Sequence, residues 1–246
     1  MNLSEKTRDT ERKMMQVFSA QKPFSEHLLK WEDPALPDKY DFNYFEYSAQ
    51  PGKDEFLAAL SYQKKLGADF LKLEGNEPLQ DSFGLEGCVT LTMVLEGQGT
   101  FVKTNEALSF RTPTPEELEE IEVKHYGSLY GEDFCRRNIR RQYGKLEYYG
   151  AFLDDGLVGA CYGFRCDGIV CIDGLIVDQD YRHQYTATSL ICHIRELYEK
   201  DMMMLHAEED DTPKEMYRKM GFTITDRQYE YLRTDLQCCE YEQILF

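Results

Sequence analysis

A short polar turn, Arg182-His183-Gln184-Tyr185-Thr186-Ala187, separates an apolar run from a segment with helical periodicity. The run, Ile169–Val177, is almost continuously apolar, which is typical of a strand covered on both faces. After the turn, apolar residues at 187, 190, 191, 194, 197 and 198 fall on one stripe of a helix. The first N–H groups of a helix have no partner inside it, and the peptide dipoles add a partial positive charge there. The turn is therefore suited to bind a phosphate or diphosphate.

Asp173 is the sole charged residue in the apolar run. Because side chains alternate along a strand, it is expected on the same face as Cys171 and Leu175. Burial disfavours the charged form of a carboxylate and makes it a better proton acceptor, so Asp173 is a candidate general base. A carboxylate held by backbone N–H groups at a strand bulge beside Gly174 explains the same residue equally well.

A second strand and a second helix follow. Met202–Ala207 is apolar, and Thr212-Pro213-Lys214-Glu215 has the capping-box pattern with proline at the first helical position. The helix that begins there contains Tyr217 and is expected to end before Gly221. Phe222–Thr225 should then return to the sheet.

The order of these motifs resembles the core of the GNAT superfamily of acyl-CoA-dependent N-acetyltransferases. Members carry Arg/Gln-x-x-Gly-x-Gly/Ala at the turn and Tyr-x-x-x-Gly-Phe at the end of the last helix. The second pattern matches in full over Tyr217–Phe222, and the first matches at Arg182 and Ala187. Tyr185 stands where glycine is usual, and Asp210 stands where many members have asparagine.

The resemblance implies an α/β fold with a central mixed (α+β) sheet flanked by helices. It covers roughly residues 109–232, so the chain is expected to divide into a smaller N-terminal α/β unit, 1–104, and an acetyltransferase domain, 105–246. The first unit alternates strand and helix patterns. It is a candidate for the degenerate half of a tandem GNAT protein, although the two halves share no motif.

By the same resemblance, the phenol of Tyr217 corresponds to the group that protonates the departing thiolate. Because the acyl group comes from acetyl-CoA as co-substrate, the amine attacks directly in a ternary complex and no protein nucleophile is required. His206 is a second candidate base, and Glu208–Asp211 could receive a cationic amine, but a structural histidine and a solvated loop are the commoner explanations. The implied coenzyme A site consists of Leu175, Ile176, Val177, Arg182, His183, Gln184, Tyr185, Thr186, Ala187, Thr188 and Asp210.

Tyr185 leaves an alternative open. Glycine permits close approach of the cofactor, whereas a side chain must point away to leave the N–H available. The resemblance implies an acetyl-CoA-dependent N-acetyltransferase acting on a primary amine of a small molecule or a protein. A non-catalytic acyl-CoA-binding or regulatory module on the same fold is the alternative, and a purely structural partner domain is a third. The identity of the amine acceptor is not encoded in any motif.

The 246-residue chain has a formal net charge of -17, which disfavours nucleic acid as a partner and slightly favours cationic acceptors. Its eight cysteines show neither metal-ligand spacing nor a secreted disulfide framework, so no metal and a reducing, cytoplasmic location are expected. Without an apolar run of about 18 residues or a signal peptide, no membrane partner is expected either. The sequence leaves open whether the chain forms a homodimer. Four arginines at 136, 137, 140 and 141 indicate a solvated helix face or a surface that attracts cofactor phosphate.

Overall fold

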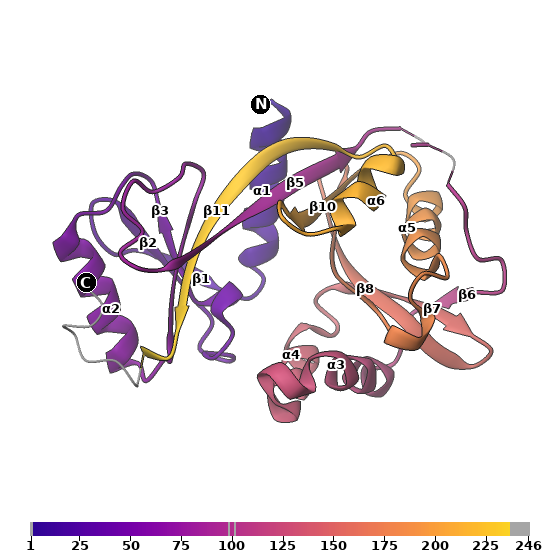
Figure 1. The fold of residues 1–246 in the computed structure, drawn as a ribbon, viewed down its shortest axis with the longest axis horizontal. Coiled ribbons are helices and arrows are strands. Elements are labelled where there is room, and N and C mark those ends of the chain that lie inside the picture. Colours follow the sequence, from indigo (N-terminus) through magenta and orange to yellow (C-terminus); the bar gives the residue numbers. More distant parts are fainter. Residues whose placement is uncertain (1, 98, 101, 237–246) are drawn as a thin grey trace. The chain divides into compact units, whose positions relative to one another are not determined.

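The computed structural model describes residues 2–97, 99, 100 and 102–236, which form two compact units (Figure 1). Unit 1 contains the residues up to Lys13 together with Thr92–Ala207 and Asp211–Thr225. Unit 2 contains Met14–Leu91, Glu208–Asp210 and the residues from Asp226 onward. Strands β5 (Glu86–Leu95) and β11 (Thr223–Thr234) contribute residues to both units. The division into domains 1–104 and 105–246 stays a prediction. Cys238 and Cys239 lie outside the described residues.

Unit 1 is built on the strand order β11-β5-β10-β9-β8-β7-β6. The strands from β6 to β9 pair in antiparallel fashion, whereas β9 and β10 are parallel and are joined through α5. Its elements are α1 (Leu3–Met15), β6 (Ser109–Arg111), α3 (Pro115–Tyr130), α4 (Glu132–Gln142), β7 (Glu147–Leu153), β8 (Gly156–Cys166), β9 (Ile169–Val177), a 3-10 turn (Gln179–Tyr181), α5 (Thr186–Leu197), β10 (Met202–Glu208) and α6 (Pro213–Lys219). The expected mixed sheet with flanking helices is confirmed.

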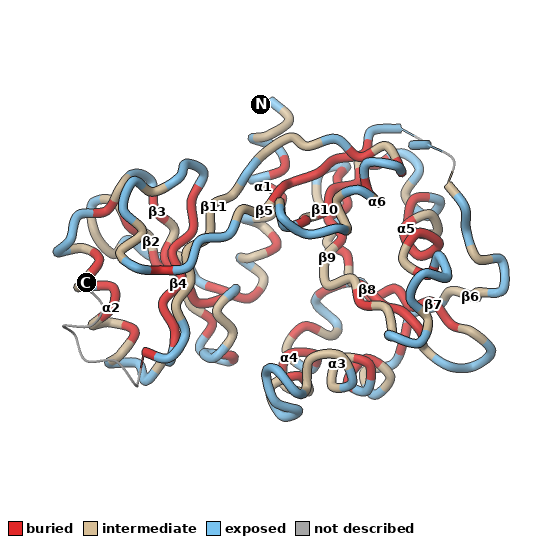
Figure 2. The backbone as a smooth tube through the Cα atoms, in the orientation of Figure 1, coloured by how far each residue is buried: buried red, intermediate tan, exposed pale blue. Residues whose placement is uncertain are grey.

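Helix α5 packs on β7, β8 and β9 through the predicted apolar stripe. Leu190, Ile191 and Ile194 are fully buried, and Figure 2 shows α5 mainly in the colours of buried and intermediate positions. Leu197 was expected on the same stripe but is 53% exposed, because it is the last residue of the helix. The stripe therefore packs against the sheet up to Ile194, and the end of α5 is held by polar contacts such as that of the Tyr198 hydroxyl with Glu147.

A tight turn sets the register of the central strands. Asp167 and Gly168 both have positive φ, 48° and 76°, as a two-residue type I′ hairpin turn requires. The resulting register places Tyr162 of β8 opposite Asp173 of β9. Across β7 and β8, Tyr148 lies opposite Tyr162. Tyr148, Tyr162 and Asp173 therefore lie side by side on the neighbouring strands β7, β8 and β9.

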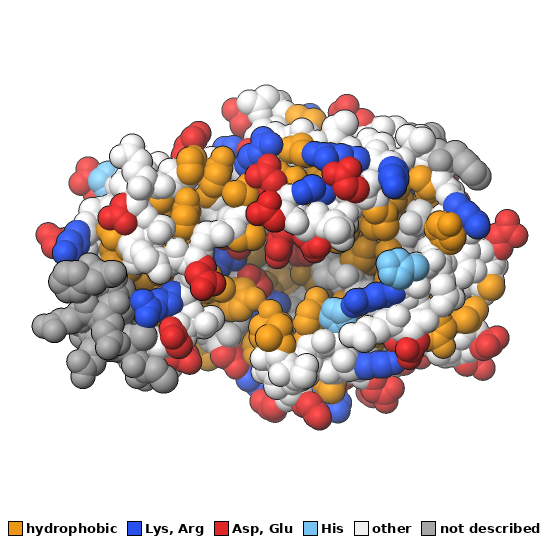
Figure 3. Space-filling model, in the orientation of Figure 1, with side chains coloured by type: hydrophobic (Ala, Val, Ile, Leu, Met, Phe, Trp, Pro, Cys, Tyr) orange, Lys and Arg blue, Asp and Glu red, His pale blue; other side chains and the backbone are white. Residues whose placement is uncertain are grey.

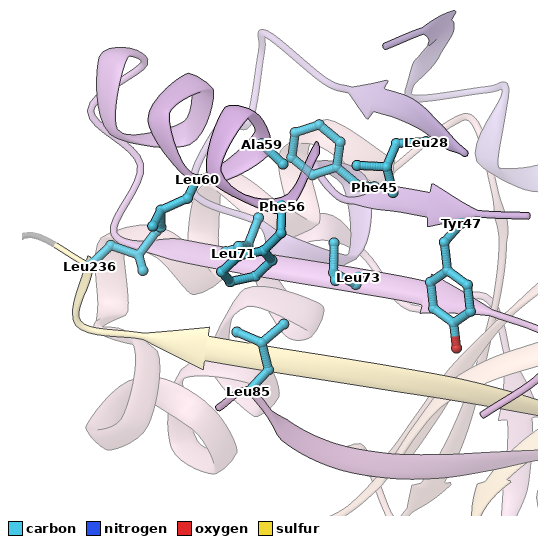
Figure 4. Close-up of a cluster of buried hydrophobic side chains, with 10 residues drawn as sticks. All are labelled: Leu28, Phe45, Tyr47, Phe56, Ala59, Leu60, Leu71, Leu73, Leu85 and Leu236. Carbon is cyan, nitrogen blue, oxygen red and sulfur yellow. The ribbon is translucent and has the colours of Figure 1, made fainter. Parts of the chain in front are cut away.

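Unit 2 has the strand order β1-β2-β3-β4-β11-β5. It contains β1 (Ala20–Pro23), β2 (Leu28–Glu32), a 3-10 turn (Tyr40–Phe42), β3 (Phe45–Tyr47), α2 (Lys53–Lys65) and β4 (Phe70–Gly75), with parts of β5 and β11. Its core lies between α2 and the sheet, where Phe56 and Leu60 of the helix meet Leu71 and Leu73 of β4 (Figure 4). No helix among the described residues of either unit is long and apolar enough to cross a bilayer.

The two units share a topology. In unit 2, three antiparallel strands β1, β2 and β3 lead through α2 to the parallel strand β4. In unit 1, the antiparallel strands β7, β8 and β9 lead through α5 to the parallel strand β10. The repeat that no sequence motif revealed is therefore visible in the order and direction of the strands.

The start of α2 is filled by a carboxylate of its own. Glu55 accepts hydrogen bonds from the backbone N–H of Gly52 at 2.9 Å, the N–H of His27 at 3.0 Å and the hydroxyl of Ser25 at 2.5 Å. Desolvation opposes ionisation of Glu55, but the bonds from Ser25, Gly52 and His27 outweigh it and lower its pKa to about 2. An internal anion therefore occupies this helix N-terminus.

Lys30 of β2 is a buried amine whose replacement should stabilise the protein. Its side chain has 0% exposure, and among the described residues its Nζ has no hydrogen-bond partner, although it lies 4.5 Å from the centre of the Phe45 ring. Burial lowers its pKa to about 7. The unfolded chain, with a lysine pKa near 10, then binds more protons between these values, so this group makes stability rise with pH across that window.

We expect Lys30→Met, which keeps the volume of the side chain, to raise the free energy of unfolding at pH 7 by about 2 kcal/mol. The pH dependence of stability between about pH 7 and 10 should also become flatter. Urea unfolding at both ends of this range measures both effects. A variant less stable than wild type at pH 7 would show that the charged amine is satisfied in the folded chain.

Candidate functional site

The turn before α5 presents backbone donors. Tyr185 precedes the helix in the left-handed region, with φ 63° and ψ 16°, and His183 also has a positive φ of 61°. The carbonyl of Tyr185 accepts from the N–H of Ser189 at 2.9 Å and from its hydroxyl at 2.8 Å. In the described part of the chain, the amides of residues 183–188 make no well-formed hydrogen bond to another protein group. These donors are therefore available to an anion.

The ring of Tyr185 does not fill this corner. The side chain is 44% exposed, and its ring lies 4.8 Å from the ammonium of Lys103. A tyrosine in the left-handed conformation costs about 1 kcal/mol relative to glycine, but it leaves the backbone path of the turn intact. The ring thus lies partly at the surface, in contact with Lys103.

The other predicted binding residues of unit 1 surround the turn. Leu175, Ile176 and Val177 form the end of β9, and the carbonyl of Val177 accepts a long hydrogen bond of 3.4 Å from Nε of the exposed Arg182. The remaining residue, Asp210, falls in unit 2, so its place in the site stays a prediction.

Asp173 is half-buried and held by two neighbours, not fully buried as its strand pattern suggested. Its Oδ1 accepts from the N–H of Gly174 at 2.7 Å, and its Oδ2 accepts from the hydroxyl of Tyr162 at 3.0 Å. The pairing of β8 and β9 is irregular beside it, and Gly174 has a φ of 61°. A Cβ on Gly174 would lie 2.5 Å from the Tyr162 ring. The bulge and the glycine thus fix the carboxylate against the phenol.

Tyr217 lies on α6 and is only 7% exposed. Burial raises its pKa to about 12, and the negative charge of Asp173 acts in the same direction. The phenol therefore remains protonated at neutral pH and can donate a proton. Tyr217 and Asp173, the two predicted catalytic residues, both lie in unit 1.

His206, the second candidate base, has its Nε2 in contact with the carboxylate of Glu11 of α1. Both side chains are largely buried, with 16% and 18% exposure. This contact ties the N-terminal helix to β10 and supports the structural role for His206.

Residues 144–224 match the family described as acetyltransferase (GNAT) domain. The match begins before β7 and ends after α6, so it includes the turn, Asp173 and Tyr217. The chain contains a GNAT domain. This domain supports acyl-CoA binding and acyl transfer in general. None of the curated proteins compared with the chain matches its sequence.

Solved structures share the fold over most of the chain. A conserved protein of unknown function from Staphylococcus epidermidis has a TM-score of 0.76 at 16% identity and covers 89% of this chain and 95% of its own. A GCN5-related N-acetyltransferase from Kribbella flavida has a TM-score of 0.66 at 12% identity, covering 94% and 95%. A tandem GNAT protein from the clavulanic acid biosynthesis pathway has a TM-score of 0.54 at 14% identity, covering 89% and 79%. The predicted resemblance to the GNAT superfamily is confirmed.

Unit 1 also holds phenols near Asp173 that sequence reasoning missed. Tyr162 contacts Asp173, and the rings of Tyr148 and Tyr162 lie 5.8 Å apart in an edge-to-face arrangement. Burial raises the pKa of Tyr126 on α3 to about 12, with Glu122 and Asp173 among the charges that contribute. The position of Tyr162 could have been predicted from the hairpin turn after β8, because the register of that hairpin places Tyr162 opposite Asp173. No local pattern indicated Tyr126.

The arginines of α4 face carboxylates of unit 1. Arg140 donates to Glu119 through Nε at 2.7 Å and Nη2 at 3.1 Å, and Arg136 reaches the same carboxylate at 3.2 Å. Arg137 pairs with Asp133 one turn away at 2.8 Å. Basic and acidic side chains are likewise interspersed on the face shown in Figure 3. These contacts favour the solvated-face explanation over attraction of cofactor phosphate.

Proposed function

We propose that this protein transfers an acetyl group from acetyl-CoA to a primary amine of a small molecule or a protein. The observation that supports it most is the set of unpartnered amides at residues 183–188, at the start of a helix inside a GNAT domain. A diphosphate would satisfy these donors and the partial positive charge of the helix. Leu175–Val177 and Arg182 would complete the binding surface.

Bound acetyl-CoA would supply the electrophilic acyl carbon, so the chain itself needs to position groups and move protons. Asp173 would accept the proton that the attacking amine loses as its bond to the acyl carbon forms. Tyr162 would hold the carboxylate of Asp173 in one orientation. Tyr217 would give its proton to the sulfur as the carbon–sulfur bond breaks. One proton is taken up and one is released, so the transfer balances.

Two measurements test the proposal. At about 100 times its dissociation constant, acetyl-CoA should add roughly 2.7 kcal/mol to the stability of the chain, visible as a thermal shift. Release of free thiol in the presence of a panel of primary amines should then report turnover. A thermal shift without thiol release for any amine would favour the non-catalytic acyl-CoA-binding module, and no shift would overturn both functions.

Asp173→Asn is expected to lower kcat by about 100-fold, because an amide cannot accept the proton and general-base catalysis contributes at least this much. The thermal shift with acetyl-CoA should be unchanged, because Asp173 is not one of the residues assigned to coenzyme A binding. Tyr162→Phe, which removes only the bond to Oδ2, should have a smaller effect. An unchanged kcat in Asp173→Asn would show that solvent accepts the proton.

A further inference from the structure

Residues 102–107, although far from the turn before α5 in sequence, are hydrogen-bonded to it through Asn105. The N–H of Asn105 donates to the hydroxyl of Ser189 on α5 at 2.8 Å, and Nδ2 of Asn105 donates to the carbonyl of Gln184 at 3.2 Å. Its Oδ1 also accepts from the N–H of Ala107 at 3.0 Å, which fixes the orientation of the amide. Asn105 therefore anchors residues 102–107 against the start of α5, within unit 1.

Lys103 lies two residues before this anchor. Its Nζ is 4.8 Å from the centre of the Tyr185 ring, close enough for a cation–π contact. In the described part of the chain, no carboxylate lies within ion-pairing distance of Lys103, although the chain carries 45 acidic residues. Among the described residues, an ammonium without an anionic partner thus lies against the ring of Tyr185, a residue of the turn whose amides also lack acceptors.

We infer that Lys103 binds a phosphate group of the coenzyme A thioester, with Tyr185 as the platform that holds it there. The inference rests on the proposed function, because it concerns the same site. An ammonium has three donors and forms strong charge-assisted bonds with phosphate oxygens. The phosphate is either part of the diphosphate or the 3′-phosphate on the ribose. Tyr185 then has a role where glycine is usual: its ring positions a cation that glycine could not hold.

Calorimetric titration of the full chain with coenzyme A and with dephospho-coenzyme A tests this assignment. Lys103→Gln should weaken coenzyme A binding about tenfold, the effect of losing a hydrogen bond to a charged group. Lys103→Arg and Tyr185→Phe, which keep the cation and the ring, should stay within about threefold of wild type. Lys200→Gln, the matched control at the opposite end of α5, should bind as wild type does.

The two ligands identify the phosphate. A loss in Lys103→Gln that occurs only with coenzyme A assigns the 3′-phosphate, and an equal loss with both ligands assigns the diphosphate. Equal affinity of wild type and Lys103→Gln for coenzyme A overturns the role of Lys103 and leaves the proposed function standing. If wild type itself gives no heat with coenzyme A, the proposed function and this inference both fail.

Discussion

Replacing Tyr217 by phenylalanine is expected to lower kcat by about 100- to 1,000-fold and to leave the affinity for acetyl-CoA within about twofold. The phenol is buried, and burial raises its pKa to about 12, so the group stays protonated in the neutral range. Its loss leaves the departing sulfur to be protonated by water. Because phenylalanine keeps the ring, the packing of Tyr217 against Phe222, with ring centres 6.0 Å apart, should survive.

Varying the thiol that leaves the thioester distinguishes two roles of Tyr217, proton donation and packing. A thioester of a more acidic thiol needs less protonation as it departs, so the penalty of Tyr217→Phe should shrink with such a donor. Tyr198→Phe is the matched control, because its hydroxyl bonds to Glu147 at 2.5 Å at the far end of α5. An equal loss of kcat with both thioesters would contradict the assignment of Tyr217 as the donor.

The largest effect on stability is expected at Lys72 of β4. Its ammonium lies 3.2 Å from Asp41, 3.1 Å from Glu74 and 2.6 Å from Glu230, all within unit 2, and its side chain is 5% exposed. Desolvation disfavours the charge, but these three carboxylates outweigh it and raise the pKa of Lys72 well above its usual range. Lys72→Met should therefore cost about 3 to 5 kcal/mol, because it leaves the largely buried Glu74 and Glu230 without a cation.

Unfolding in urea, followed by the fluorescence of Trp31, measures this cost. Trp31 is the sole tryptophan and is buried in unit 2, so it reports on the unit that contains Lys72. Lys22→Met is the control: its ion pair with Glu32 at 2.6 Å involves a lysine that is 47% exposed, and it should cost at most about 1 kcal/mol. Similar losses in the two variants would show that burial does not strengthen the network around Lys72.

The elements of the site could be predicted where local chemistry decides them. The apolar run of β9, the helical stripe of α5 and the proline at the start of α6 were each visible in the sequence, and the structure has these elements. The contact of Tyr185 with Lys103 could not be predicted, because the two residues are 82 positions apart. The exposure of Asp173 likewise depends on pairing with Tyr162 across a bulge. Local periodicity carries no information on such long-range contacts.

The N-terminus of α2, in unit 2, is already bound by a carboxylate of the same chain. The N–H of Gly52 at its N-cap, with Ser25 and His27, donates to Glu55, an anion that is covalently part of the chain. A free phosphate group would have to displace a ligand whose effective concentration is set by its own backbone. The two strand–helix–strand copies therefore differ in anion binding: a side chain of the protein serves as the anion in unit 2, whereas the amides before α5 in unit 1 have no such internal acceptor among the described residues.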